Sequence, residues 1–402
     1  MDTKYNAHPR IEAARNLVLA ACEGLQAAAR PDGAAPATLE ALGEAPDRGA
    51  EGGACVWQAS RATGVRFGDI TGAPEALQTI WESLIVPVKF PLIFRQAKAK
   101  PWRAVLLYGP PGTGKSMIAR ATASESAANF YNACCAELTS KWVGGSEKLM
   151  KSLFAHAREH SPAIIFFDEI DSVAGSRDGQ KSIADQRLTN QLLIELDACL
   201  HASESIFVIA ATNLPWQIDM AVMRRFPKRI YIALPDGAGR AAMFARALAD
   251  VATLRYALRR AATVAAPREP DMPPTPSDDE LAHVVAATQG FSGADICNVV
   301  NDVGLEPLRL LTSATAFLVR VCPASGEVQS VEAAAAGVGG AAAAGDHVLQ
   351  DTTLEAVVAR FSEQRVRVGA VTYAMLAACV ARGKGSVDAA SVRKYEAYND
   401  SV

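Results

Sequence analysis

The sequence predicts an α/β fold in which helices bury a parallel β-sheet on both faces. Short apolar runs at residues 104–108, 163–167, 206–210 and 229–234 alternate with longer stretches of helical periodicity. This alternation is typical of βαβ units, whose crossover helices cover the sheet. The chain has 402 residues, of which 50% are hydrophobic. That length and composition suit roughly two to three domains with a sizeable core.

Composition and charge exclude several classes of protein. The 40 Lys and Arg residues nearly balance the 43 Asp and Glu residues, for a net charge of −3, so we expect no nucleic-acid binding through bulk positive charge. The first residues lack the basic and apolar regions of a secretion signal, and no uncharged stretch reaches the roughly 18 apolar residues that cross a bilayer. We therefore expect a cytoplasmic protein. The eight cysteines show no paired spacing, which favours buried thiols over disulfides or a zinc site.

The strongest motif follows the first predicted strand of the alternating region. It has the pattern G-x-x-x-x-G-K-[ST] and consists of Gly109, Pro110, Pro111, Gly112, Thr113, Gly114, Lys115 and Ser116. The glycines allow the loop to wrap a phosphate chain with its backbone N–H groups. Lys115 adds a cation at the β- and γ-phosphates, and Ser116 offers a hydroxyl to Mg²⁺. The motif therefore predicts a site for ATP and Mg²⁺.

Two further strands end in polar residues that would complete this site. Asp168 and Glu169 follow the apolar run at 163–167, and Asn213 follows the run at 206–210. We expect Asp168 to join the Mg²⁺ shell and Glu169 to polarise the attacking water, because phosphoryl transfer depends on positioning and charge neutralisation. Asn213 could orient the same water, or it could simply cap the next turn.

With these elements in place, the chain resembles the AAA ATPases, and within them the meiotic clade. It is most similar there to the ATPases that dismantle ESCRT-III polymers. The likeness covers roughly residues 63 to 320 and, more weakly, the C-terminal 30. The segments that carry it, besides the motifs above, are Asp69-Ile70-Thr71-Gly72, residues 85–91, 213–219, 229–236, 290–295 and 306–315.

The resemblance implies an AAA+ P-loop NTPase fold with several parts. A large α/β ATPase domain would span residues 63–236, and a small helical lid domain with a Pro-rich insertion would span 237–312. A reduced β-domain-like insertion with Ala/Gly low complexity would follow at 313–352, and C-terminal helices at 353–402 would close the small domain. Tyr395 and Tyr398 would pack on the ATPase domain. Residues 1–62 hold one legible helix and a linker, not a clear example of the three-helix MIT domain by which this family recruits substrate.

The resemblance also implies roles for individual residues. The nucleotide would contact Asp69, Ile70, Gly72 and Met117, as well as Gly293 and Ala294 in the lid. Arg224 and Arg225 stand where the family carries arginine fingers, which complete the nucleotide site of a neighbouring subunit. Such trans catalysis implies a ring, typically a homo-hexamer. Lys141, Trp142 and Val143 match the central-pore loop that grips a threaded polypeptide.

The implied function is a ring-forming, Mg-ATP-dependent ATPase that disassembles ESCRT-III polymers in endosomal sorting. Partners, with a possible adaptor, would recruit it to endosomal membranes. A microtubule-severing ATPase of the katanin, spastin or fidgetin kind is the main alternative, since it shares every catalytic residue. Severing enzymes lack a β insertion and usually carry a basic linker, whereas residues 31–60 are not basic. A nucleotide-dependent scaffold without hydrolysis is a third possibility, and Glu169 argues against it.

Overall fold

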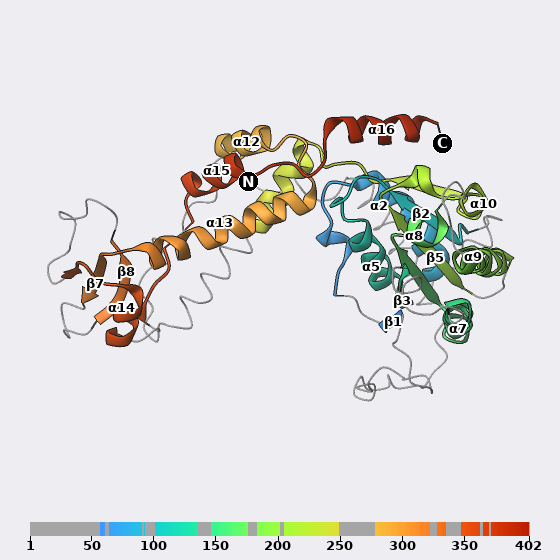
Figure 1. Ribbon diagram of the computed structural model, residues 1–402, viewed down its shortest axis with the longest axis horizontal. Helices are drawn as coiled ribbons and strands as arrows, with labels where there is room; N and C mark the ends of the chain where they lie inside the picture. The colour runs from blue at the N-terminus through green and yellow to red at the C-terminus, as the bar shows by residue number, and fades with distance from the viewer. Residues whose placement is uncertain are drawn as a thin grey trace, which may run out of the picture. The chain divides into compact units, whose positions relative to one another are not determined.

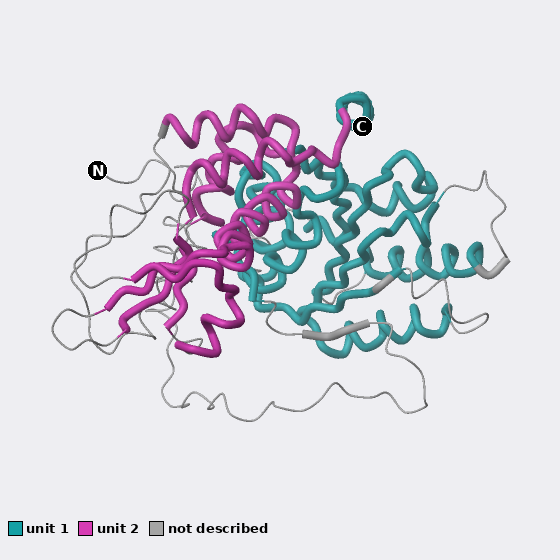
Figure 2. Tube along the Cα trace, turned by 60° about the vertical axis from the view of Figure 1, so that its left-hand side comes forward, with its two compact units in different colours: residues 1–234, 389–402 teal, residues 235–388 magenta. Residues whose placement is uncertain are grey.

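The computed structural model describes residues 57–60, 64–90, 92, 101–135, 146–175, 183–201, 205–248, 278–321, 328–334, 347–361, 365–369 and 371–401. The chain divides into two compact units, residues 1–234 with 389–402 (unit 1) and residues 235–388 (unit 2), which Figure 2 colours separately. The helix expected at residues 10–30 and most of the Pro-rich insertion lie outside the described residues. The domain boundaries given above stay a prediction.

Unit 1 is built on a six-stranded sheet with the order β1-β3-β4-β5-β2-β6. Its strands are β1 (Trp57–Ser60), β2 (Ala104–Tyr108), β3 (Asn129–Cys134), β4 (Ala163–Asp168), β5 (Ile206–Thr212) and β6 (Lys228–Tyr231). Strands β2 to β6 pair in parallel, which confirms the predicted parallel sheet. Strand β1 pairs antiparallel with β3. The expectation of a linker at β1 was wrong, since four residues are too few for a clear strand pattern. Strand β3 was not among the predicted runs, because asparagines, which are poor strand formers, interrupt it.

Two layers of helices cover this sheet (Figure 1). Helices α2 (Pro74–Ile80) and α5 (Lys115–Ser126), with the π-helical turn η2 (Trp81–Ile85) and α3 (Val86–Lys89), lie on one side. Helices α7 (Ser146–Glu159) and α9 (Ile183–His201) lie on the other. Successive residues of β4 alternate between the two layers: Ile164 and Phe166 join the first core, while Ile165 and Phe167 join the second. Burial on both faces explains why β4 reads as a continuous apolar run.

Helix α16 (Ala389–Asp400) also belongs to unit 1. The ring of Tyr398 lies 5.6 Å from that of Tyr108, and the ring of Tyr395 lies 5.1 Å from that of Trp216. The Tyr108 hydroxyl donates to Asn399 Oδ1 at 2.7 Å. These contacts confirm that Tyr395 and Tyr398 pack on the ATPase unit. The expectation that all of residues 353–402 close the small domain is therefore wrong for α16, because Tyr395 is buried and Tyr398 partly buried against the rest of unit 1.

Unit 2 combines helices with a small antiparallel sheet of order β8-β7-β9. It contains a helical stretch at 237–248, the helices α12 (Asp278–Ala287), α13 (Gly293–Ser313), α14 (Leu354–Phe361) and α15 (Tyr373–Arg382), and the strands β7 (Phe317–Val321), β8 (Val328–Ala333) and β9 (His347–Leu349). Phe244, Ile296 and Leu376 belong to its helical core. Phe317 and Val331 belong to a second core beneath the sheet.

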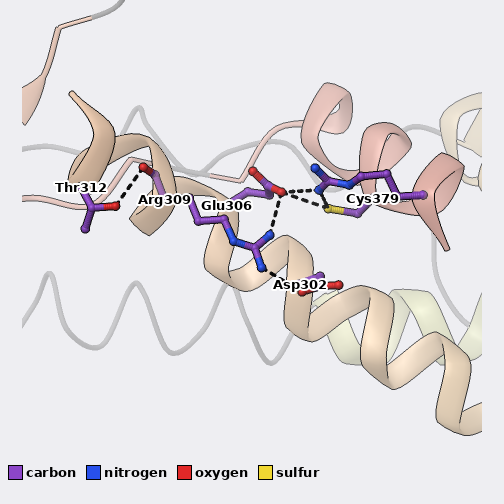
Figure 3. Close-up of polar contacts among 6 residues, drawn as sticks. Asp302, Glu306, Arg309, Thr312 and Cys379 are labelled. Carbon is purple, nitrogen blue, oxygen red and sulfur yellow. Dashed lines mark hydrogen bonds and ion pairs between the residues drawn. The ribbon is translucent and has the colours of Figure 1, made fainter. Parts of the chain in front are cut away.

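A charged network joins α13 to α15, as Figure 3 shows. Arg382 and Arg309 both donate to Glu306 Oε1, and Arg309 also pairs with Asp302. The Arg382 guanidinium, followed by that of Arg309, lowers the pKa of the Glu306 carboxyl. Because the two arginines are largely exposed to solvent, the network contributes little to stability.

Of the four cysteines whose burial the structure describes, three are buried as predicted. Cys135, Cys199 and Cys379 are buried free thiols, whereas Cys297 is free but exposed, so the prediction was wrong for Cys297. Burial raises the pKa of the Cys199 thiol to about 11, which keeps it protonated and unreactive near neutral pH. No helix in the described part of the chain is long and apolar enough to cross a membrane.

Candidate nucleotide site

The loop between β2 and α5 has the backbone of a phosphate-binding loop. All five residues of β2 are buried, so the strand delivers the loop from a rigid position in the sheet. Gly109, Gly112 and Gly114 all have positive φ angles, of 150°, 75° and 87°. Only glycine adopts these conformations without strain. Helix α5 begins at Lys115, and its N-terminal N–H groups can therefore face an anion held in the loop.

Gly109 is required by space as well as by φ. A Cβ atom built at this position would lie 2.2 Å from the carbonyl oxygen of Ile232, which follows β6. The Ile232 N–H donates to the carbonyl of Tyr108 at 2.8 Å. The start of the loop is therefore clamped against the end of β6, and a side chain at position 109 would force the two apart.

Lys115 lies folded against the loop that precedes it. Its Nζ donates to the carbonyl oxygens of Gly109 at 2.9 Å and of Pro110 at 2.7 Å. Burial lowers the pKa of Lys115 to about 8, although the negative charges of Asp168 and Asp171 act to raise it. The Lys115 amine is thus largely removed from water, and a nearby phosphate would favour its protonated form.

Ser116 and Asp168, predicted separately as metal ligands, are in direct contact. The Ser116 hydroxyl donates to Asp168 Oδ2 at 2.7 Å, although 52 positions separate the two residues along the chain. A hydroxyl and a carboxylate are both hard oxygen ligands of the kind Mg²⁺ takes. No cluster of three or more His, Cys, Asp and Glu side chains in the described ranges could hold a metal ion alone. These residues therefore fit a site at which water and phosphate oxygens supply the remaining ligands.

Glu169 and Asn213 flank this pair with unusual local features. Glu169 is exposed and adopts a left-handed conformation with φ of 51°, which costs a non-glycine residue roughly 1 kcal/mol or more. The Oδ1 atom of Asn213 is buried and has no hydrogen-bond partner. Buried polar atoms are rarely left unpaired, so this amide is suited to accept a hydrogen bond from a bound water or ligand.

Sequence reasoning missed the residues that hold Asn213 in place. The Thr212 hydroxyl donates to Asp171 Oδ1 at 2.6 Å and accepts from the Leu214 N–H at 2.9 Å. The hydroxyl of Tyr395 in α16 donates to the backbone carbonyl of Asn213. The threonine beside Asn213 could have suggested the first contact. The second joins residues 182 positions apart, and no local sequence pattern indicates it.

The segment at residues 69–72, predicted to contact the nucleotide, begins beside α5. Asp69 closes the 3-10 turn η1 (Phe67–Asp69), where its carboxylate accepts from the Arg66 N–H at 2.7 Å. Ile70 packs against the core that α5 contributes to, and Gly72 has a φ of 86°. Met117 is exposed on the first turn of α5. Their contact with a nucleotide stays a prediction.

The two candidate arginine fingers differ in their surroundings. Arg225 donates through Nε and Nη2 to both carboxylate oxygens of Asp197 on α9, each at 2.9 Å. This bidentate pair lowers the pKa of Asp197 and fixes the direction of the Arg225 side chain. Arg224 is exposed. Both follow the short helix α10 (Met220–Met223) at the surface of unit 1.

The remaining predicted residues belong to unit 2 or lie outside the described residues. Gly293 and Ala294 open α13 in unit 2, where Ser292 and Asp295 form a capping box around them. Lys141, Trp142 and Val143 lie outside the described residues. The roles of all five stay predictions.

A family model described as "ATPase family associated with various cellular activities (AAA)" matches residues 105–234. This is the part of the chain that holds the phosphate-binding loop, the Ser116–Asp168 pair and Asn213. The match and the geometry together define an AAA ATPase domain, a class of nucleotide-binding α/β domain, and this part of the chain belongs to that family.

Particular relatives share more of the chain. It is 41% identical over 254 residues to the protein SUPPRESSOR OF K(+) TRANSPORT GROWTH DEFECT 1 of Arabidopsis thaliana, a match covering 63% of this chain and 53% of that one. It is 40% identical over 259 residues to human (Homo sapiens) vacuolar protein sorting-associated protein 4A, covering 64% and 54%. The chain thus spans about half the length of the curated relatives it matches. The crystal structure of the FIGL-1 AAA domain in complex with ADP is similar in fold, with a TM-score of 0.58 at 27% identity, covering 86% of this chain and 93% of that one.

Proposed function

We propose that the chain hydrolyses ATP with Mg²⁺ as part of a ring, and that it uses this energy to pull subunits out of ESCRT-III polymers in endosomal sorting. The observation that carries the hydrolytic part is the contact between Ser116 and Asp168 beside a buried Lys115. The similarity to vacuolar protein sorting-associated protein 4A supports the sorting role. Recruitment to endosomal membranes through partners, with an adaptor, is part of the same proposal.

In this proposal each residue of the site has a distinct task. The backbone of the loop and Lys115 hold the phosphates of ATP. Ser116 and Asp168 hold Mg²⁺, which when bound neutralises charge on the phosphate oxygens. The buried amide of Asn213 orients the attacking water, and Glu169 accepts its proton.

The arginines supply the other half of each site in the ring. The exposed position of Arg224 on unit 1 leaves it available to a second copy of the chain. A cation placed at the γ-phosphate of a neighbour stabilises the charge that spreads there in the transition state. Full turnover therefore requires assembly, in a homo-hexamer or a ring of similar size.

The test uses Glu169→Gln, which should bind ATP but hydrolyse it at least about 100-fold more slowly, as expected when a general base is lost. This ATP-bound protein is incubated separately with ESCRT-III filaments and with microtubules, and each polymer is sedimented. We expect co-sedimentation with ESCRT-III alone. A matched Lys115→Ala, Glu169→Gln double variant, which should lose ATP, controls for binding that does not depend on nucleotide.

Two results would contradict the proposal. Hydrolysis by Glu169→Gln at the parent rate would remove the assigned base. Co-sedimentation with microtubules but not with ESCRT-III filaments would replace the sorting role with a severing role.

A further inference from the structure

Arg229 on β6 bonds to the loop that carries the two candidate arginine fingers. Its Nη2 donates to the carbonyl of Met223 at 3.2 Å, and its Nε donates to the carbonyl of Phe226 at 3.3 Å. Met223 and Phe226 are the residues immediately before and after Arg224 and Arg225. One guanidinium thus holds the backbone on both sides of the arginine pair.

The loop is fixed at its two ends by other groups. At its start, the Asp219 carboxylate accepts from the Ala221 N–H at 2.7 Å and caps α10. At its end, Phe226 is fully buried in the core of unit 1. Between these points, the Arg225 N–H donates to the Val222 carbonyl at 2.9 Å, and the Arg225 side chain donates to the Ala221 carbonyl at 3.1 Å. Arg229 adds bonds from the neighbouring strand to the carbonyls of Met223 and Phe226, and Arg224 lies exposed in the turn.

The chemistry of this contact calls for arginine. The Met223 carbonyl, the last of the four-residue helix α10, accepts from the Phe226 N–H at 3.2 Å, and its second lone pair is open to a side-chain donor. A guanidinium is planar, stays charged at all relevant pH values and presents several N–H donors in a fixed fork. It can therefore bond two carbonyls that face it from different positions. A lysine at this position would offer a single ammonium group on a flexible side chain, without the fixed geometry of the guanidinium N–H donors.

Arg229 lies on β6, which pairs with β2, the strand that leads into the phosphate-binding loop. In the parallel pairing of β2 with β6, Arg229 lies opposite Leu106, two residues before Tyr108. Burial is the main reason that the pKa of Tyr108 is raised to about 12, and the nearby Arg229 charge acts in the opposite direction. The same cation also opposes the rise that burial causes in the pKa of Tyr398. Arg229 thus bonds to the turn that carries the fingers and is near the tyrosines at which α16 packs on unit 1.

We propose that Arg229 is the positioning residue of the arginine-finger loop: by holding the carbonyls of Met223 and Phe226, it sets the geometry in which Arg224 reaches the nucleotide of a second copy of the chain. This inference rests on the proposed trans catalysis. It assigns Arg229 no contact with substrate. Because misplacement of a catalytic group by about 1 Å can cost on the order of 100-fold in rate, release of this turn should lower kcat and leave nucleotide binding by the subunit's own loop intact.

The test compares Arg229→Gln, Arg229→Lys and a control, Arg103→Gln. Arg103 also donates to a backbone carbonyl of unit 1, that of Cys199 at 3.2 Å, which lies outside the turn. For both Arg229 variants we expect ADP affinity within about twofold of the parent, an unchanged KM for ATP within about threefold, and a kcat at least about 10-fold lower. Arg103→Gln should keep a kcat within about twofold of the parent.

Mixing experiments separate positioning from folding. Arg229→Gln subunits have an intact pocket and a faulty finger loop, so mixing them with Lys115→Ala subunits should restore turnover, as mixing Arg224→Ala with Lys115→Ala should. Mixing Arg229→Gln with Arg224→Ala should restore nothing, because both defects lie on the same side of the interface.

Three results decide the matter. A parent-like kcat in Arg229→Gln would overturn the inference. Loss of ADP binding in both Arg229 variants would also overturn it, because the residue would then support the fold as a whole. If Arg224→Ala with Lys115→Ala is itself inactive while each variant still assembles, trans catalysis fails, and the proposed function fails independently of any role of Arg229.

Discussion

The buried position of Lys115 predicts that nucleotide affinity falls as pH rises through about 8. Burial lowers the pKa of this lysine to about 8 in the free protein. The phosphates of a bound nucleotide would raise that pKa again, because an opposite charge favours the protonated form. Binding then takes up a proton wherever the free lysine is deprotonated, and affinity is highest below the free pKa and is lost above it.

The magnitude follows from that pKa. About three quarters of Lys115 is protonated at pH 7.5 and about one tenth at pH 9, so affinity should fall about eightfold, or about 1.3 kcal/mol, between them. Near pH 8 each binding event should take up about half a proton. Calorimetric titration with ADP, without Mg²⁺, in two buffers of different ionisation enthalpy measures both quantities.

The matched control is Lys115→Arg, because a guanidinium keeps its charge throughout this range. Its affinity can be lower overall, but it should not depend on pH between 7.5 and 9. Parent affinity that stays constant over the same range, with no proton uptake at pH 8, would refute the reasoning that links the burial of Lys115 to nucleotide binding.

Three further predictions concern stability. Gly109→Ala places a Cβ 2.2 Å from the Ile232 carbonyl oxygen and should lower the free energy of unfolding by at least about 2 kcal/mol, measured by urea denaturation; an unchanged midpoint would contradict the clamp on the loop. Tyr395→Phe removes the hydroxyl that donates to the Asn213 carbonyl and should cost about 1 kcal/mol, with faster hydrogen exchange in α16 as the local sign. Phe154→Ala empties a fully buried site and should cost about 3–5 kcal/mol; a smaller loss would mean that α7 packs loosely on the sheet.

The local geometry of the candidate nucleotide site was largely predictable because its residues follow strands and turns that local sequence specifies. The phosphate-binding loop is a contiguous motif, and the apolar run of β4 leads directly to Asp168 and Glu169. Strand β3 was not predictable in the same way, because Asn129 and Asn132 weaken its pattern, and tertiary pairing with β4 compensates for them.

Contacts between distant segments account for the rest. Nothing near Tyr395 in the sequence indicates that its hydroxyl reaches the Asn213 carbonyl. Likewise, the sequence places Arg229 in a segment that resembles the AAA ATPases, but it does not predict the hydrogen bond from Arg229 to the Met223 carbonyl. That bond depends on the register of β6 beside β2. Such contacts arise from the packing of whole helices and strands. The motifs identify the residues of the site, whereas these long-range contacts set the orientation of those residues.

The short strand β1 has a practical consequence for any shortened version of this protein. It pairs with β3 from Trp57↔Ala133 to Ser60↔Phe130, and so supplies backbone partners to a strand that would otherwise end the sheet. A fragment trimmed to begin after residue 60 would present a bare row of N–H and C=O groups along β3, which is a template for intermolecular pairing. A fragment that keeps residues 57–60 should therefore stay monodisperse at concentrations where the trimmed fragment precipitates.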